Sequence, residues 1–328
     1  MAALAAGGLT ACGATANDQI SHPTGDRSSA AAAKTAAPAS NPSNPGNRST
    51  PSAKGPSPLH SLASPRIRVA GAPGGVKAKG AVLADASTGQ VLWERAADTE
   101  RPMASITKVM TALVVIRAGN LDRAITIPSA VVGYVAEWDA SSAGLVPGDR
   151  LTARQLLAGL LLPSGADAAY ALAQAYGPGI PAFISKMNAT ARQLGLGRTH
   201  FANFDGLPWP GEYSTYSTAA DLITLGRDAM ASAVFRSIVD LGSYRLPAGS
   251  GHHAYRWQNT NPLLGAYRGA IGIKTGYTLA AGHCLLFEAS RGGRTFIGVT
   301  LGSPGVGTTV NGADPTRLLN WAFSLPGR

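Results

Sequence analysis

The sequence predicts an α+β domain built around one antiparallel sheet. Alternating apolar and polar residues, which are typical of strands, occur near residue 80, and further strand-like segments lie between residues 269 and 303. The chain between these regions has the helical period instead. Strands at both ends with helices in between favour a sheet shared by the two ends of the domain. We expect helices to flank this sheet and to build a second, mainly helical region.

The first residues predict a leader segment and not part of the fold. Residues 1–12 are short, apolar and rich in small side chains, and Leu9-Thr10-Ala11-Cys12 matches the lipobox, whose cysteine is lipidated and becomes the new N-terminus. The run is about half as long as a usual signal peptide, and no basic residue precedes it. Either the start codon lies upstream, or this is the remnant of an ordinary signal cut elsewhere. We expect an extracytoplasmic protein of the cell envelope, tethered to the membrane through Cys12 or secreted.

Residues 13–78 predict a disordered tether. They are rich in Ala, Ser, Pro, Thr, Asn and Gly, and they carry too little apolar surface to offset the entropy cost of ordering. A random chain of this length spans roughly 45 Å, enough to hold a domain away from a membrane. The catalytic domain is therefore expected at residues 79–328.

Charge and cysteine content exclude several classes of protein. The 328 residues carry a net charge of +10, and the first 80 hold eight Lys and Arg residues against two Asp. This basic segment fits an arm attracted to an anionic surface, or a soluble spacer. Its basic residues are not interleaved with aromatic ones, which argues against nucleic-acid binding. Cys12 and Cys284 cannot form a disulfide framework, and no Cys/His spacing suits zinc, so we expect no metal and no cofactor.

The domain begins with two strands and a helix. The run 79–95 alternates well enough for two strands, with Ser87-Thr88-Gly89 as the turn. Residues 104–118 follow, with their apolar residues on one helical stripe. Four further helices are expected at residues 152–162, 167–177, 181–195 and 217–230.

Strands return near the C-terminus. They are expected at residues 269–278, 283–290 and 294–303. A closing helix is expected to begin at Asp314-Pro315, which reads as a cap followed by a first-turn proline.

The helix expected at 104–118 opens with Ser105-x-x-Lys108. Residues three apart lie on one helical face, so the lysine amine should lie beside the serine hydroxyl. A serine is a weak nucleophile without a base in hydrogen-bond reach, and a lysine is such a base when desolvation or a neighbouring cation lowers its pKa. The helix N-terminus also favours negative charge. The alternative is a capping serine and a lysine whose amine snorkels to solvent.

Ser164-Gly165 is expected in a turn between two apolar helices. Taken alone, the pattern indicates an N-cap serine with an acid, Asp167, in the first turn.

Lys274-Thr275-Gly276 falls in the apolar strand expected at 269–278. Lysine and glycine both suit a strand interior poorly. The glycine would permit close approach of another backbone, such as a substrate laid alongside as an added strand, and the lysine would then attract a carboxylate. The alternative is an edge-strand lysine that discourages aggregation.

Ser-x-x-Lys, Ser-Gly-x and Lys-Thr-Gly, in this order, are the signature of penicillin-interacting serine enzymes. The chain resembles the D-alanyl-D-alanine carboxypeptidase family, in particular its single-domain actinobacterial DD-transpeptidases, over residues 79–328. Segments such as ADASTGQVLWERAADTERPMASITKVMTAL and NTNPLLGAYRGAIGIKTGYT extend the resemblance beyond the motifs. It implies a β-lactamase/transpeptidase-like fold, activity on peptidoglycan stem peptides ending in D-Ala-D-Ala, and covalent inhibition by β-lactams.

The resemblance also implies roles for single residues. Ser105 would be the acylated nucleophile, Lys108 its general base, and Ser164 a relay of protons toward the leaving group. The second motif departs from the family pattern, because Ala166 stands where an asparagine is usual. Its amide would bond Lys108 and the substrate backbone, so the site is expected to lack one polar clamp.

The third motif would bind the substrate. By the resemblance, Lys274 and Thr275 would hold the terminal carboxylate, with Gly276 in the same substrate-binding strand. The backbone N–H groups of Ser105 and Tyr277 would form the oxyanion hole.

Two other functions use the same residues. A class A-like β-lactamase has the same three motifs but needs a carboxylate to activate the deacylating water. No Glu-x-x-Leu-Asn segment occurs between Ser164 and Lys274, and Glu212 lies in a Trp-Pro-Gly-rich loop. The other alternative is a catalytically weak wall-binding homologue, which only Ala166 supports.

Overall fold

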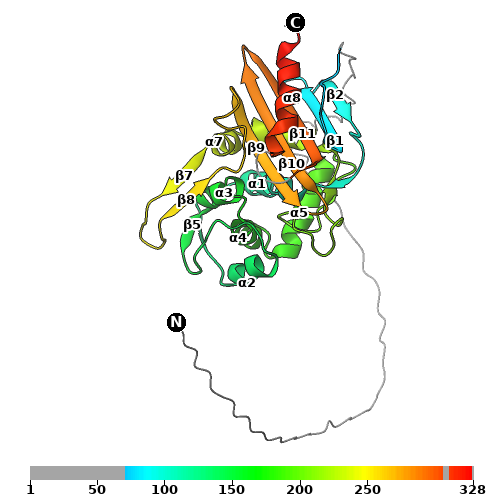
Figure 1. The fold of residues 1–328 in the computed structure, drawn as a ribbon. Helices are drawn as coiled ribbons and strands as arrows, with labels where there is room; N and C mark the ends of the chain where they lie inside the picture. Colours follow the sequence, from blue (N-terminus) through cyan, green and yellow to red (C-terminus); the bar gives the residue numbers. More distant parts are fainter. Residues whose placement is uncertain (1–70, 306–309, 327–328) are drawn as a thin grey trace, which may run out of the picture. The chain divides into compact units, whose positions relative to one another are not determined.

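A computed structural model describes residues 71–305 and 310–326 (Figure 1). The lipobox with Cys12 and most of the expected tether lie outside the described residues. The centre of the fold is an antiparallel sheet with the strand order β2-β1-β11-β10-β9. The two ends of the chain build this sheet together, as predicted from the sequence. Its strands are β1 (Gly80–Asp85), β2 (Val91–Arg95), β9 (Ala270–Thr278), β10 (Gly282–Arg291) and β11 (Arg294–Ser303).

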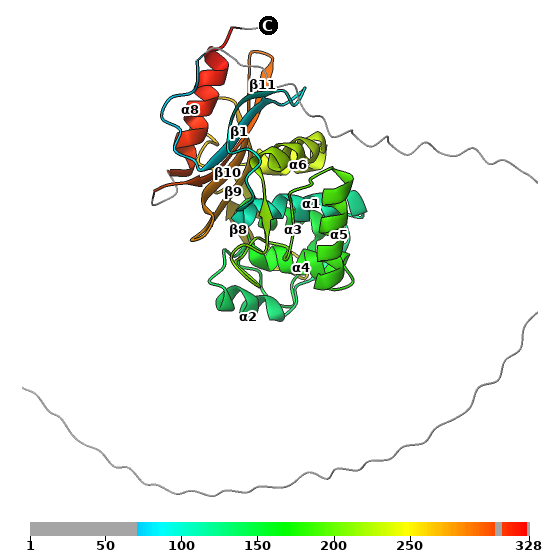
Figure 2. The same cartoon turned by 90° about the vertical axis from the view of Figure 1, so that its right-hand side faces the viewer.

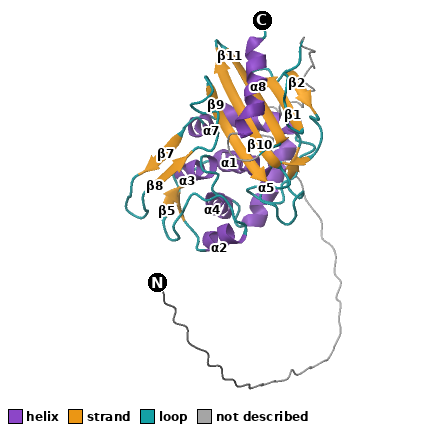
Figure 3. Ribbon diagram, viewed as in Figure 1, coloured by secondary structure: helices purple, strands orange, loops and turns teal. Residues whose placement is uncertain are grey.

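The middle of the chain forms the predicted helical region below the sheet (Figure 3). Its helices are η1 (Ala104–Ile106), α1 (Thr107–Ala118), α2 (Ala130–Glu137), α3 (Ala153–Leu161), α4 (Ala166–Tyr176), α5 (Ile180–Gln193), α6 (Ala219–Ala231) and α7 (Ala233–Val239). The C-terminal helix α8 (Val310–Ser324) packs on the sheet. The sequence predicted all of these except α2 and α7, which are too short to give a clear period. The described helices include none that is both long and apolar enough to cross a membrane.

Three short strand pairs were not predicted. Each is only two to four residues long and forms through contacts with residues distant in the sequence or across a loop. They are β3 (Arg101–Pro102) with β6 (Tyr216–Ser217), β4 (Ala124–Thr126) with β5 (Arg150–Thr152), and β7 (Ser243–Leu246) with β8 (Tyr255–Gln258).

Helices cover both faces of the sheet (Figure 2). Leu285 and Phe287 of β10 face α8 in one hydrophobic cluster, while Leu286, between them, belongs to the larger cluster shared with α1 and α6. This alternation follows from the two-residue period of a strand. The sheet is therefore apolar on both faces, and the larger cluster continues into the helical region.

Helix α1 is the centre of that larger cluster. The sequence predicted one apolar stripe, but every residue from Thr107 to Val115 is buried. A helix that is buried all round lies inside the core and not on its surface. The polar residues at its start, including Lys108, are consequently removed from water.

Two predicted boundaries were wrong. The folded chain begins before residue 79, because Val76 and Ala78 are buried in the cluster under α8. Helix α8 begins at Val310 and includes Pro315, so Asp314 is not its cap. The Asp314 carboxylate instead accepts hydrogen bonds from Lys77 N, from Ser303 Oγ and from the guanidinium of Arg317. These contacts join the first described segment, β11 and α8, and no local sequence pattern predicts them.

Glu288 of β10 is a buried acid on the same face of the sheet as Leu286, toward the larger hydrophobic cluster. It is 4% exposed, and burial raises the pKa of its carboxyl from 4.5 to about 6, with the charge of Arg236 opposing this effect. The folded state therefore holds this proton more tightly than the unfolded chain does. Stability from this group is present at low pH and is lost as the pH rises through the interval between the two pKa values.

We expect Glu288→Gln to stabilise the domain near neutral pH by about 2 kcal/mol, because the variant carries no charge that must be desolvated. The gain should disappear at about pH 4, where the carboxyl is neutral in both states. Urea unfolding at the two pH values measures this difference. The exposed Glu212→Gln is the control, and an equal gain at both pH values would contradict the burial argument.

Candidate active site

The first predicted pair lies together in the structure. Ser105 is in the 3₁₀ turn η1, directly before α1, and Lys108 is the second residue of α1. The turn keeps the serine and the lysine on one side of the chain, and Lys108 Nζ lies 2.9 Å from Ser105 Oγ. Lys108 is 1% exposed, so the alternative of a snorkelling lysine is wrong. Ser105 makes no side-chain cap of the helix, so the capping alternative is wrong as well.

Burial determines the charge state of Lys108. Removal of its amine from water lowers the pKa of Lys108, and the negative charges of Asp205 and Asp167 partly oppose this effect. Its second hydrogen-bond partner is the backbone carbonyl oxygen of Asp205, at 3.1 Å from Nζ. A neutral carbonyl does not compensate a buried positive charge as a carboxylate would. The arrangement therefore favours an uncharged amine, which can accept a proton.

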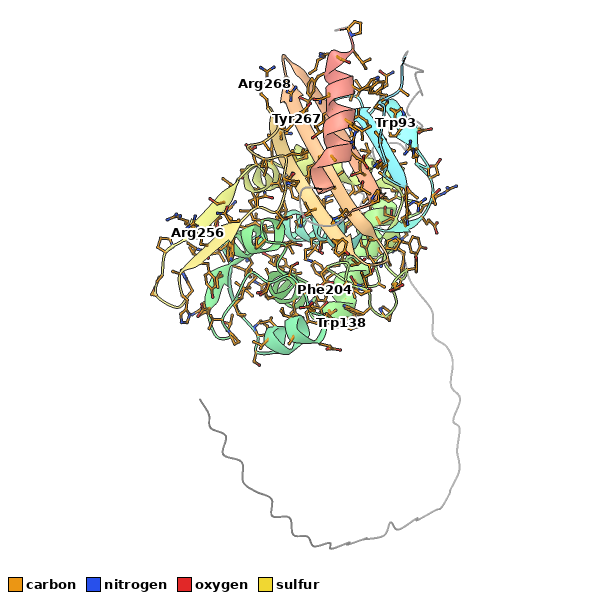
Figure 4. All side chains as sticks on the ribbon, in the orientation of Figure 1. Trp93, Trp138, Phe204, Arg256, Tyr267 and Arg268 are labelled. Carbon is orange, nitrogen blue, oxygen red and sulfur yellow. The ribbon has the colours of Figure 1, made fainter. Side chains whose placement is uncertain are left out.

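The carboxyl of Asp205 is fully buried beside α1. Its Oδ2 accepts a 2.7 Å hydrogen bond from Tyr134 Oη, and Trp209 Nε1 in turn donates to the same tyrosine oxygen at 2.8 Å. Burial raises the pKa of Asp205, while the charge of Lys108 and the bond from Tyr134 act against this rise. Phe204, labelled in Figure 4, stacks at a tilt on Tyr134. The acid is thus held within an aromatic shell.

Ser164 lies in the turn between α3 and α4, and it does not cap α4. The N-cap of α4 is Gly165, which makes no side-chain cap bond, so the capping interpretation is wrong. The backbone of Ser164 is in the left-handed region, with φ = 67°. Its side-chain oxygen is buried and has no hydrogen-bond partner among the described residues. A strained backbone and an unpaired buried hydroxyl are typical of functional sites.

Asp167 of α4 fixes the loop between α2 and β5 against this turn. The buried carboxylate accepts hydrogen bonds from the hydroxyl of Ser142 and from the backbone N–H groups of Ala143 and Leu145. Ala166, in the position of the usual asparagine, is fully buried, and its N–H donates to the carbonyl of Ser141. Lys108 therefore has no amide partner from this motif.

The third motif lies on β9, the edge strand of the sheet. Lys274 is only 1% exposed, so an edge lysine that points to solvent is excluded. Its Nζ donates to the carbonyl oxygen of Thr275 at 3.1 Å, and Thr275 Oγ1 lies 2.6 Å from Thr260 Oγ1. Burial lowers the pKa of Lys274 well below its ordinary value, and the charge of Lys108 adds to the effect. Tyr277, next on this strand, is 55% exposed.

Gly276 brings the third motif against the first. A Cβ atom at this position would lie 2.8 Å from the carbonyl oxygen of Met103 and 3.0 Å from the backbone nitrogen of Ser105. Only glycine permits this approach of two backbones. The structure therefore places β9 directly beside the start of α1, with Ser105 N–H at the contact.

The match to known proteins agrees with this geometry. Residues 67–305 match the D-alanyl-D-alanine carboxypeptidase family. The chain belongs to this family. It is 43% identical over 262 residues to the D-alanyl-D-alanine carboxypeptidase of Streptomyces sp. strain K15, an alignment that covers 76% of this chain and 88% of the relative. It is 40% identical over 247 residues to a D-alanyl-D-alanine carboxypeptidase of Mycobacterium tuberculosis, covering 74% and 81%.

Solved structures of family members share the fold. The crystal structure of the Streptomyces K15 DD-transpeptidase superposes with a TM-score of 0.72 at 42% identity and covers 76% of this chain and 98% of that one. A carboxypeptidase structure from M. tuberculosis gives 0.71 at 36% identity, covering 80% and 97%. The predicted family and the β-lactamase/transpeptidase-like α+β fold are confirmed.

Sequence reasoning missed several residues of the site in this family member. The backbone carbonyl of Asp205 accepts a hydrogen bond from Lys108, and its carboxylate accepts one from Tyr134. The hydroxyl of Thr260 contacts that of Thr275. None of these three residues belongs to a motif. A lone acid within the apolar segment HFANFDGL was the available signal for Asp205. Tyr134 lies 71 residues before Asp205, and nothing local marks it. Thr260 lies within the family-like segment NTNPLLGAYRGAIGIKTGYT, but only the structure shows its contact with Thr275.

We expect Gly276→Ala to lower the rate of labelling by fluorescent penicillin by about 10²-fold, because displacement of β9 by the new Cβ misaligns the site. The rate is measured by gel fluorescence, and circular dichroism checks the fold. Gly197→Ala is the matched control, since no atom lies within 4 Å of its Cβ position. Equal rates for the two variants would show that the close contact at Ser105 N is unimportant.

Proposed function

We propose that Ser105 and Lys108 make this protein a serine-type D-Ala-D-Ala carboxypeptidase and transpeptidase of peptidoglycan stem peptides. The observation that carries the proposal is the 2.9 Å contact between Lys108 Nζ and Ser105 Oγ in a buried environment that favours the uncharged amine. A neutral lysine in this position is a general base for the hydroxyl.

In the first step the Ser105 hydroxyl gives its proton to Lys108 Nζ while Oγ attacks the carbonyl carbon of the penultimate D-Ala. The backbone N–H groups of Ser105 and Tyr277 stabilise the oxyanion of the tetrahedral intermediate. When the intermediate collapses, the C–N bond breaks and the leaving D-Ala amine takes up a proton through the Ser164 hydroxyl. An ester on Ser105 remains. The unpaired Ser164 oxygen supports the role of a relay.

Lys274 and Thr275 bind the terminal carboxylate of the peptide in this proposal, and Gly276 lets the substrate-binding strand lie against Ser105. Thr260 Oγ1 orients the Thr275 hydroxyl through their 2.6 Å contact. A carboxylate that enters the site restores positive charge to a lysine whose charged form is disfavoured by burial.

Water or an amine then resolves the ester, as hydrolysis or transpeptidation. A β-lactam also forms an ester with Ser105 Oγ, but the C–N bond that breaks lies in its ring, so the amine stays attached and no fragment leaves. The chain has no Glu-x-x-Leu-Asn segment between Ser164 and Lys274 that would activate a deacylating water. We therefore expect a long-lived penicilloyl enzyme and not the rapid turnover of a β-lactamase.

The proposed substrate lies outside the cytoplasm. We infer that Cys12, at the end of the lipobox-like sequence, is lipidated and anchors the protein to the envelope membrane, or that the protein is secreted after cleavage elsewhere. Mass spectrometry of the N-terminal peptide from the native envelope separates the two.

The proposal is tested with a stem peptide that ends in D-Ala-D-Ala, with and without an amine acceptor, by analysis of products. Ser105→Ala should abolish both products and also the mass increase of the intact protein after benzylpenicillin. A residual adduct in Ser105→Ala would show that another residue is the nucleophile. A wall-binding protein without activity would give no adduct even in the wild type.

The pH dependence of penicillin acylation tests the role of Lys108. The base is active only when uncharged, so the rate should rise with pH through the lowered pKa of Lys108. Of the two carboxylates that raise the pKa of Lys108, Asp205 has the larger effect. Asp205→Asn removes this charge, so the rising limb of the pH profile should move to lower pH. The exposed Asp122→Asn should leave the limb in place. A shift to higher pH in Asp205→Asn would contradict the assignment of the base.

A further inference from the structure

The β7–β8 hairpin presents two arginines side by side on its outer face. Arg245 and Arg256 lie directly opposite one another in the antiparallel register, and both are exposed. The next pair on the same face is Ser243 opposite Gln258, which is also exposed. Figure 4 shows Arg256 on this hairpin, which projects from the side of the molecule beside α3 and β5. Directly opposite residues have Cβ atoms about 5 Å apart, so one ligand can contact both guanidinium groups.

The inner face holds the hairpin firmly against the helical region. Tyr244 and Trp257 stack with ring centroids 5.6 Å apart, and Trp257 Nε1 donates to the carbonyl of Ala143 at 2.8 Å. The hydroxyl of Tyr255 donates to Asp149 at 2.5 Å. The two arginines therefore lie on a strand pair that packing and hydrogen bonds anchor to the helical region.

No acid in the described residues neutralises the pair. Neither guanidinium makes a hydrogen bond or an ion pair there, and the sequence from 241 to 287 contains no Asp or Glu. Asp149, under the hairpin, is buried and already bonded to Tyr255 and His253. Two like charges directly opposite on a sheet are destabilising. An anionic ligand between the two guanidinium groups would offset their repulsion, so this pair is suited to binding an anion.

The basic face is connected to the candidate active site. Strand β8 ends at Gln258, and Thr260, two residues later, contacts Thr275 Oγ1. Three residues separate Arg256 from Thr260, and four steps along an extended chain span at most about 13 Å. Trp257 contacts Ala143 in the loop that Asp167 fixes against the Ser164 turn. The hairpin is thus joined to the third motif along the chain and to the Ser164 turn through the loop at Ala143.

We propose that Arg245 and Arg256 form a secondary binding surface for carboxylates of peptidoglycan stem peptides, outside the catalytic cleft. This inference rests on the proposed function, which supplies the polymer. Guanidinium groups bind carboxylates through two parallel hydrogen bonds, and the adjacent Ser243 and Gln258 add neutral hydrogen-bonding groups. The surface recruits the wall polymer and takes no part in acyl transfer.

Co-sedimentation of the full chain with insoluble peptidoglycan tests the surface. The peptidoglycan is first freed of phosphodiester polymers with hydrofluoric acid. Arg245→Gln/Arg256→Gln should bind about three- to tenfold more weakly than wild type at low salt. The matched control is Arg192→Gln/Arg268→Gln, which removes the same charge from two exposed positions elsewhere and should bind like wild type. Amidation of the peptidoglycan carboxylates should remove the difference between the two variants.

Three results would overturn the inference: equal losses in both double variants, a difference that persists after amidation, or a difference seen only with walls that retain phosphodiester polymers or with phosphatidylglycerol vesicles. The last result would assign the surface to phosphate groups. Labelling of Ser105 by fluorescent penicillin is followed in parallel and should be equal in wild type and variants. Absence of label in the wild type would defeat the proposed function, whereas the binding result judges the hairpin separately.

Discussion

The amine of Lys108 is buried and lies 2.9 Å from the hydroxyl of Ser105. The position of α1, of β9 and of the residues around Asp205 all bear on this contact. A charged lysine there would need a carboxylate in contact, but Nζ meets only a hydroxyl and a backbone carbonyl. Burial lowers the pKa of Lys108 and so favours the neutral amine, while the negative charges of Asp205 and Asp167 oppose this effect in part. The reactivity proposed for Ser105 is thus a consequence of core packing: α1 is central, and its first turn is buried with it.

The sheet contributes by bringing a second backbone to the same point. Gly276 of β9 meets the carbonyl of Met103 and the nitrogen of Ser105 at a distance that no side chain allows. Residues far apart in the sequence then share one site, because the strand order places β9 at the sheet edge beside the start of α1. An edge position also leaves one row of backbone groups available for a peptide. Edge exposure and close backbone contact are both needed for a site that handles an extended substrate.

Buried carboxylates around the site have different functions. Asp205, enclosed by aromatic residues and bonded to Tyr134, sets the electrostatic field at Lys108 without touching its amine through the side chain. Asp167 is saturated with hydrogen bonds and fixes the loop against the Ser164 turn. Trp257 of the β7–β8 hairpin donates a hydrogen bond to that loop, so the hairpin is joined through the loop to the Ser164 turn. The proposed binding surface and the proposed catalytic pair thus occupy separate positions of one scaffold.

Local patterns were sufficient to predict the shared sheet, most helices, the three motifs and the family, because periodicity and motif spacing are properties of neighbouring residues. They also predicted that Ser105 and Lys108 lie side by side, because the two residues are about one helical turn apart. They did not predict α2, α7, the short strand pairs or the start of α8, since these depend on partners elsewhere in the chain. The interpretation of Ser164 and Lys274 was likewise open in the sequence, where a capping serine and an exposed edge lysine were reasonable alternatives. Only the tertiary structure excluded these alternatives and added Asp205, Tyr134 and Thr260, because burial and electrostatic fields arise from residues that folding alone brings together.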